Sequence, residues 1–141
     1  EEKTPQTIER FRDYFDRALP FLRYAPMIFI SALEGTRVHT LLDMVIHVAE
    51  NQHRSLSEEQ LAPILEKLNT IIRPRATNVR KNKKPKIIFH AFVQEEGIPP
   101  TFLLRVNLPK DVPPALLPIC ERELREQFDF DGTLIKIMLQ K

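Results

Sequence analysis

The strongest constraint on the fold of this chain is a pair of strand-length apolar segments, residues 86–93 and 101–108, separated by only seven residues. In the second segment Phe102, Leu104 and Val106 occupy alternate positions, which is the period of a strand that buries one face. The connection contains glycine and two prolines and is short enough for a direct reversal of the chain. The two segments therefore predict an antiparallel β-hairpin.

A helix is predicted on the N-terminal side of this hairpin, over residues 57–72. Ser57 and Gln60 have the spacing of a capping box, in which each side chain accepts a hydrogen bond from the other residue's backbone N–H. Pro63 conflicts with a regular helix, because an interior proline removes a backbone hydrogen bond and costs about 3 kcal/mol. Either the first turn is kinked, or the helix begins near Ala62 and holds Pro63 in its first turn.

Another helix and a third strand are predicted on the C-terminal side of the hairpin. An amphipathic pattern that includes Cys120 follows Pro113 and Pro114, and residues 133–140 alternate as a final strand. The element order from residue 57 is then α-β-β-α-β. We therefore predict that residues 55–141 form an α+β domain, with a three-stranded sheet and two helices on one of its faces.

The N-terminal part, residues 1–52, has the pattern of an incomplete α/β domain. Residues 5–22 carry apolar side chains at helical spacing, and a second amphipathic helix is predicted from Gly35 to about Asn51. Between them, residues 27–30 are uniformly apolar and predict a strand buried on both faces. No other predicted strand of this part could pair with it, which is typical of the end of a larger sheet domain.

Glycine and cysteine usage excludes several kinds of site. Gly35, Gly97 and Gly132 are too far apart for a Walker P-loop, a dinucleotide G-x-G-x-x-G motif or the G-x-x-G loop of an ordinary RNA-binding KH domain. Such loops bring backbone amides close to phosphates, which glycine permits. Cys120 is the only cysteine, so an intrachain disulfide and a multi-cysteine zinc site are excluded. We expect this chain alone to hold no nucleoside triphosphate by any of these glycine loops.

Positive charge is concentrated in residues 73–86, a segment with no acidic residue. Its seven cations are Arg73, Arg75, Arg80, Lys81, Lys83, Lys84 and Lys86. The chain has 21 basic and 19 acidic residues in all, so the rest of it carries 14 basic against 19 acidic residues. A basic segment in an acidic body favours a polyanionic partner. The plainer alternative is a solvated surface loop.

Other residue groups predict no further chemistry. His39, Asp43 and His47 share one helix face at a spacing that could bind a metal, but this is the polar face, where solvated side chains are expected, so we predict no metal site and no catalytic residue. No apolar run approaches the roughly 20 residues of a membrane span, and the first residues lack a signal-peptide pattern. With a free cysteine, this predicts a cytoplasmic protein without membrane contact.

Four motifs resemble, in order and spacing, the C-terminal part of the Der family of bacterial GTPases, also called EngA, which have two tandem GTPase domains. They are FLRYAPMIFISA at 21–32, PPTF at 99–102, VN at 106–107 and LREQFDFDGT at 124–133. Together they span nearly the whole chain. There are two departures: Leu134 stands where the family usually has proline, and the first strand of the hairpin departs from the family's aromatic-Ala-Thr-Gln pattern.

The resemblance implies both a fold and a function. Residues 1–52 would be the α-β-α tail of a Ras-like α/β GTPase domain, and residues 55–141 a KH-like domain without the G-x-x-G loop. The whole protein would be a GTPase that uses GTP and Mg²⁺ and acts in ribosome biogenesis, in maturation of the large subunit. The implied partners are the large ribosomal subunit or its rRNA, and the GTPase domains of the same chain. The nucleotide chemistry would lie upstream of Glu1.

At residue level the resemblance assigns only Ser31, Ala32 and Leu33, as the loop whose backbone amide contacts the guanine base in the intact protein. The segment 73–86 has no residue-by-residue match, so its RNA-facing role rests on its charge. Three function classes stay open. They are a non-catalytic part of a ribosome-assembly GTPase, a free-standing RNA-binding module, and a protein-interaction scaffold with little RNA contact.

Overall fold

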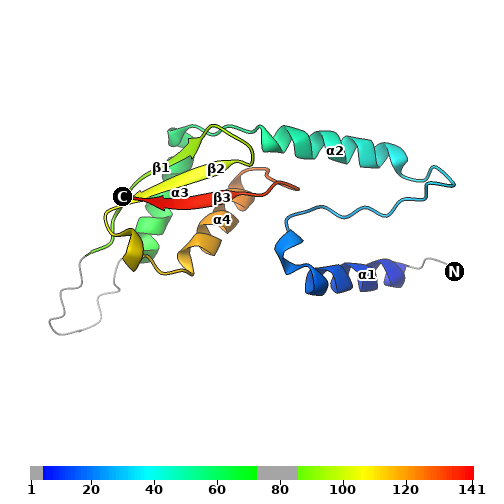
Figure 1. Ribbon diagram of the computed structural model, residues 1–141, viewed down its shortest axis with the longest axis horizontal. Helices are drawn as coiled ribbons and strands as arrows, with labels where there is room; N and C mark the ends of the chain where they lie inside the picture. The colour runs from blue at the N-terminus through cyan, green and yellow to red at the C-terminus, as the bar shows by residue number, and fades with distance from the viewer. Residues whose placement is uncertain (1–4, 73–85) are drawn as a thin grey trace.

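The structure, a computed structural model, describes residues 5–72 and 86–141 (Figure 1). Its helices are α1 (Pro5–Ala18), α2 (Val38–Gln52), α3 (Glu58–Ile72) and α4 (Leu116–Gln127), with short 3-10 helices η1 (Pro20–Leu22) and η2 (Pro109–Asp111). Its strands are β1 (Phe89–Glu95), β2 (Thr101–Val106) and β3 (Lys136–Gln140). In these two ranges, no helix combines the length and the apolar character needed to cross a membrane.

The three strands form one mixed sheet in the order β1-β2-β3. β1 and β2 are antiparallel, as the hairpin pattern predicted, and β2 and β3 are parallel. The helices α3 and α4 cover one face of this sheet (Figure 1). The predicted α+β class and the α-β-β-α-β order are therefore confirmed.

The core lies between this sheet and its two helices. Leu61, Ile64 and Leu68 of α3 are fully buried, because their spacing places them on one side of the helix. Phe102 of β2 lies near the rings of Phe92 and Phe130, with ring centroids 5.6 and 5.8 Å apart respectively. Burial of each such ring contributes about 2–3 kcal/mol relative to exposure.

The start of α3 follows the predicted capping box. The backbone N–H of Ser57 donates to Gln60 Oε1 at 2.9 Å, and the N–H of Gln60 donates to Ser57 Oγ at 3.3 Å. The helix begins at Glu58, so Pro63 lies in its second turn and not its first. A start near Ala62 was therefore wrong.

The N-terminal part differs from the prediction at its expected strand. Residues 26–30 form no strand, and α2 begins at Val38, after Arg37 in the left-handed region with φ 60°. The nearest strand-like pairing is a single bridge between Ser31 and Thr36. A strand needs a neighbour for its backbone hydrogen bonds, and none of the described strands lies beside residues 27–30. The expected strand over these residues is thus wrong for this chain.

Candidate functional site

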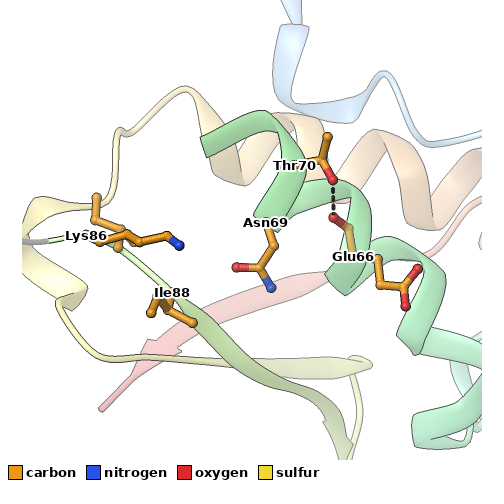
Figure 2. A pocket seen from close by; sticks show the side chains of 6 residues that line it. Glu66, Asn69, Thr70, Lys86 and Ile88 are labelled. Carbon is orange, nitrogen blue, oxygen red and sulfur yellow. Dashed lines mark hydrogen bonds between the residues drawn. The ribbon is translucent and has the colours of Figure 1, made fainter. Parts of the chain in front are cut away.

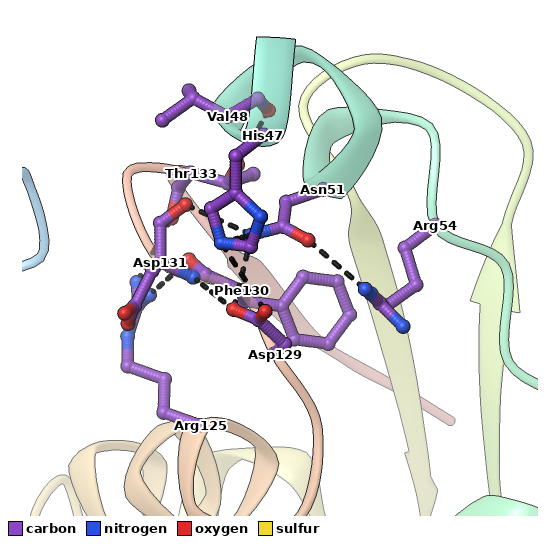
Figure 3. Close-up of polar contacts among 9 residues, drawn as sticks. All are labelled: His47, Val48, Asn51, Arg54, Arg125, Asp129, Phe130, Asp131 and Thr133. Atoms are coloured by element: carbon purple, nitrogen blue, oxygen red, sulfur yellow. Dashed lines mark hydrogen bonds and ion pairs between the residues drawn. The ribbon is translucent and has the colours of Figure 1, made fainter. Parts of the chain in front are cut away.

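A polar network joins the end of α2 to the loop between α4 and β3 (Figure 3). Its centre is Asn51, whose side chain is completely buried. The Asn51 Nδ2 group donates to Asp129 Oδ1 at 3.0 Å and to the backbone oxygen of Asp131 at 3.2 Å. Its Oδ1 atom accepts a hydrogen bond from Arg54 at 3.0 Å. We call the contacts between residues 24–56 and the rest of the chain the junction.

His47, one turn before Asn51, also contacts Asp129. The His47 Nε2 atom lies 3.2 Å from Asp129 Oδ2 and 3.2 Å from Asn51 Nδ2. An amide NH2 group has two hydrogens, and those of Asn51 serve Asp129 and Asp131. We therefore assign a proton to His47 Nε2, which donates to the Asp129 carboxylate.

The surroundings of Asp129 favour its ionised form. Partial burial acts to raise the pKa of Asp129, but the backbone N–H of Asp131, the His47 ring and two further neighbours outweigh that effect. The pKa of Asp129 therefore lies below its ordinary value, and the carboxylate is held in the junction by charge as well as by hydrogen bonds.

Gly132 provides a second contact in the junction. Its backbone N–H donates to the backbone oxygen of Tyr24 at 2.8 Å, and its φ of +74° is in the left-handed region. A Cβ atom here would lie 2.2 Å from Cγ2 of Val48, so both the conformation and the space require glycine. The guanidinium of Arg125 lies 5.2 Å from the centroid of the Tyr24 ring.

Gln94 of β1 fixes the linker between α2 and α3. Its Oε1 atom accepts a hydrogen bond from the backbone N–H of Leu56, and its Nε2 group donates to the backbone oxygen of Arg54, both at 2.8 Å. Gln94 thereby pairs with the linker as a neighbouring strand would. The linker and α2 are both held against the sheet domain.

At the other end of the sheet, two asparagines hold the residues that lead into β1. Asn69 of α3 exchanges two hydrogen bonds with the backbone of Phe89, at 2.9 and 3.0 Å. Asn107 accepts from the N–H of Ile88 and donates to the backbone oxygen of Lys86. The start of β1 is therefore fixed from both sides.

A cavity of about 460 Å³ lies between α3 and these residues (Figure 2). It is lined by Glu66, Asn69, Thr70, Lys86, Ile87 and Ile88. The hydroxyl of Thr70 donates to the backbone oxygen of Glu66, four residues earlier. The polar groups of Asn69 already pair with Phe89, so the cavity offers mainly the charges of Lys86 and Glu66.

Most of the predicted RNA-facing residues lie outside the described part of the chain. They are Arg73, Arg75, Arg80, Lys81, Lys83 and Lys84. Lys86 is the member of the set that the structure describes, and it is exposed just before β1.

Comparison with known proteins identifies the family. Residues 56–140 match the family model described as KH-domain-like of EngA bacterial GTPase enzymes, C-terminal. The chain belongs to this family. The resemblance seen in its motifs is thereby confirmed, and the α-β-β-α-β domain is an EngA-type KH-like domain.

Relatives named GTPase Der match the whole chain. The protein of Halothermothrix orenii is 36% identical over 141 residues, covering 99% of this chain and 31% of the relative. That of Acetivibrio thermocellus is 33% identical over 140 residues, with the same two coverages. That of Gloeothece citriformis is 33% identical over 137 residues, covering 97% of this chain and 29% of the relative. The chain thus spans about a third of the length of these relatives.

The proposed guanine loop of this Der-type chain lies at the start of a turn, in the part of the molecule away from the sheet (Figure 1). The N–H of Ser31 donates to the backbone oxygen of Thr36 at 3.1 Å. Ala32 and Leu33 are exposed, and neither forms a hydrogen bond to another described residue. Their backbone N–H groups are free to donate, as contact with a purine carbonyl would require.

Two further candidates from the sequence are the possible metal ligands on α2 and the single cysteine. Within residues 5–72 and 86–141, no three His, Cys, Asp or Glu side chains lie close enough together to hold a metal ion, and His47 of the predicted face contacts Asp129 instead. Cys120 is buried in the core of the KH-like domain. Burial, with the charges of Glu123 and Glu121, raises the pKa of the Cys120 thiol to about 12.

Sequence reasoning missed the junction in this EngA-type domain. Asn51 and Asp129 are far apart in sequence, and neither lies in a motif with known chemistry. The local signal at this place is the Asp131-Gly132 pair, which is typical of a turn but does not show what packs against that turn.

Proposed function

We propose that this chain is the C-terminal part of a cytoplasmic GTPase that acts in ribosome biogenesis, in maturation of the large subunit. In this proposal the KH-like domain contacts rRNA, and the junction connects it to the end of the preceding GTPase domain. Family membership and the names of the relatives support the GTPase part. The observation that carries the RNA part is the run of seven cations without an acid at residues 73–86.

The described residues on either side of this segment are Ile72, which ends α3, and Lys86, which precedes β1 at the end of the sheet away from the junction. The segment contains no aromatic residue on which a base could stack, so contacts to phosphates with little sequence preference are expected.

The nucleotide part of the proposal lies mainly outside this chain. GTP and Mg²⁺ would bind to the preceding part of the protein, and Ser31, Ala32 and Leu33 would contribute only a contact to the guanine base. The free N–H groups of Ala32 and Leu33 support this assignment. A fluorescent GTP analogue should bind to a longer chain that includes the preceding domain. Micromolar binding to the 141-residue chain alone would contradict the proposal.

An interaction scaffold that holds GTPase domains together is the second candidate. It is favoured by the junction and by the exposed apolar residues of α2, among them Leu42, Val45 and Ile46. A free-standing RNA-binding module is less well supported, because the relatives are about three times as long as the chain.

RNA binding distinguishes the first proposal from the scaffold. If about four phosphates of single-stranded RNA are contacted, log K should fall against log salt with a slope of about −3. The variant with Lys81→Glu, Lys83→Glu and Lys84→Glu should bind large-subunit rRNA much more weakly and still fold. The matched control reverses Arg10, Arg12 and Arg17 of α1 and should keep wild-type affinity. Equal affinity of the lysine variant and wild type at low salt would favour the scaffold.

A further inference from the structure

The described cations of the KH-like domain fall into two groups. Three of them form ion pairs on the helices: Lys67 with Glu123, Arg122 with Glu123 and Glu126, and Arg125 with Glu121. The other five form no ion pair with any residue of the described ranges, and they are Lys86, Arg105, Lys110, Lys136 and Lys141. The segment 73–85 contains no acid that could pair with them.

Four of these five unpaired cations lie at the same end of the sheet. β1 runs antiparallel to β2, and β3 runs parallel to it, so the start of β1 lies beside the ends of β2 and β3. Lys86 precedes β1, Arg105 is near the end of β2, Lys110 follows in η2 and Lys141 follows β3. Only Lys136 lies at the opposite end.

Contacts between neighbouring residues confirm that Lys86, Arg105 and Lys141 are close together. The side chain of Asn107, two residues after Arg105, donates to the backbone oxygen of Lys86 at 2.8 Å. Arg105 Nε donates to the side chain of Gln140, the residue before Lys141, at 3.3 Å. All four cations are exposed, so their charges face solvent.

Exposed acidic residues are fewer at this end of the sheet than at the end that carries the junction. The exposed acids near this end are Asp111 in η2 and Glu66 beside the cavity, and neither forms an ion pair within the described residues. The end that carries the junction holds Glu95 and Glu96 of the hairpin loop together with Asp129 and Asp131. The domain is therefore polarised along its strands, with its positive end away from the junction.

We propose that Lys86, Arg105, Lys110 and Lys141, which we call the sheet-end surface, bind the phosphate backbone of RNA. The inference rests on the proposed function and adds to it three residues, Arg105, Lys110 and Lys141, that the sequence did not single out. Four cations that form no ion pair with a described acidic residue leave their charge available to phosphates, and each contact releases a condensed counterion. Phe89, the phenylalanine at this end of the sheet, is buried and offers no stacking surface. The contact is therefore to the backbone and not to the bases.

The test compares two double variants of the 141-residue chain with equal loss of charge. Arg105→Gln with Lys110→Gln removes two cations of the sheet-end surface. The control, Arg12→Gln with Lys136→Gln, removes two exposed cations elsewhere that also form no ion pair within the described residues. Binding is measured by fluorescence anisotropy with labelled single-stranded RNA of mixed sequence, over a range of salt concentrations.

Each lost contact to a single strand should make the salt slope shallower by about 0.7 and weaken binding roughly fivefold at about 0.1 M salt. The Arg105 and Lys110 variant should therefore bind roughly 25-fold more weakly, with a slope shallower by about 1.4. The control should change affinity by less than about twofold. Lys141→Gln alone should weaken binding roughly fivefold. Because Lys141 lies outside the strands, this variant tests the surface without a change in the sheet.

The results distinguish a failure of the sheet-end surface from a failure of the proposed function. If the lysine variant of residues 81–84 loses RNA binding while the Arg105 and Lys110 variant keeps wild-type affinity, the sheet-end surface is wrong and the proposed function stands. If the wild-type chain does not bind RNA, both are wrong. If polyglutamate competes with RNA as strongly as polyuridylate does, the surface binds acidic chains in general and the phosphate assignment is overturned.

Discussion

Asn51 connects segments that are far apart in the chain. Its hydrogen-bond partners Asp129 and Asp131 are 78 and 80 residues away, and Arg54 is three residues away. Because Asn51 is fully buried, its amide must be paired, and the junction provides a partner for each of its polar atoms. Loss of this amide would remove its hydrogen bonds to these three residues, each of which contributes about 0.5–1.5 kcal/mol.

Asp129 gives the junction a dependence on pH. Its pKa in the folded chain lies below the ordinary value of about 3.9 for an aspartate, so its ionised form contributes stability above that pH. This contribution is lost as the pH falls through the folded pKa. We predict that the amides in the last turn of α2 lose protection from hydrogen exchange on acidification below about pH 4.

Asp129→Asn should remove this acid transition, because an amide cannot ionise. The protection factors of residues 48–52, followed by NMR, should then change little with pH over the same range. Asp13→Asn, at an exposed position of α1, is the control and should keep the wild-type transition. A transition unchanged in the Asp129 variant would show that another group controls the junction.

At the scale of elements, Pro63 is the clearest departure from a regular helix. It lies in the second turn of α3, where the missing N–H leaves the carbonyl oxygen of Glu59 without its helical partner. Pro63 is exposed, so its replacement removes little packing. We predict that Pro63→Ala raises the free energy of unfolding by about 1–3 kcal/mol, measured by urea denaturation.

The matched control for this change is Glu66→Ala, at another exposed position of the same helix. It should change the free energy of unfolding by no more than about 0.5 kcal/mol. A loss of stability in the Pro63 variant would mean that the proline ring makes packing contacts that outweigh the restored hydrogen bond.

The elements of the KH-like domain could be predicted because their signals are local. The capping box of Ser57 and Gln60 and the alternation in β2 depend on residues close in sequence. The strand ends were less predictable. β3 begins at Lys136 and not at residue 133, since the backbone oxygen of Thr133 accepts a hydrogen bond from Arg125 on α4. That contact depends on tertiary packing, which no local pattern contains.

The expected strand at residues 27–30 failed for a related reason. Its apolar, partly β-branched sequence is typical of a buried strand, but a strand also needs a partner. The pattern alone does not reveal whether the chain includes that partner.

At the scale of the whole molecule, the sequence predicted the basic segment and the family, because charge runs and motifs are visible in one dimension. It did not predict the junction or the sheet-end surface. The residues of the sheet-end surface are spread from Lys86 to Lys141 and come together only through the strand order β1-β2-β3. That Arg105 and Lys110 form no ion pair with a described residue likewise becomes visible only when neighbours in space are known.

The same view of the molecule predicts an uneven stability along the chain. Large apolar side chains of α1 and α2 are exposed, including Phe11, Tyr14, Val45 and Ile46, whereas those of the KH-like domain form one buried cluster. Local opening costs little where few apolar contacts are lost. We predict that residues 5–46 exchange their amide hydrogens faster than the core elements α3, β2 and α4.

The junction makes α2 the informative element, since its two ends differ. Leu42 and Val45 are more than half exposed, but Asn51 in the last turn is buried and bonded to the KH-like domain. Protection should therefore rise along α2 toward its C-terminal end, and Asn51→Ala should abolish this rise while leaving α3 protected. The experiment requires a monomeric sample, checked by analytical ultracentrifugation, because a second copy could cover the apolar face. Uniform protection from residue 5 to residue 140 in a monomer would contradict the prediction, since the N-terminal part would then be as stably packed as the sheet domain.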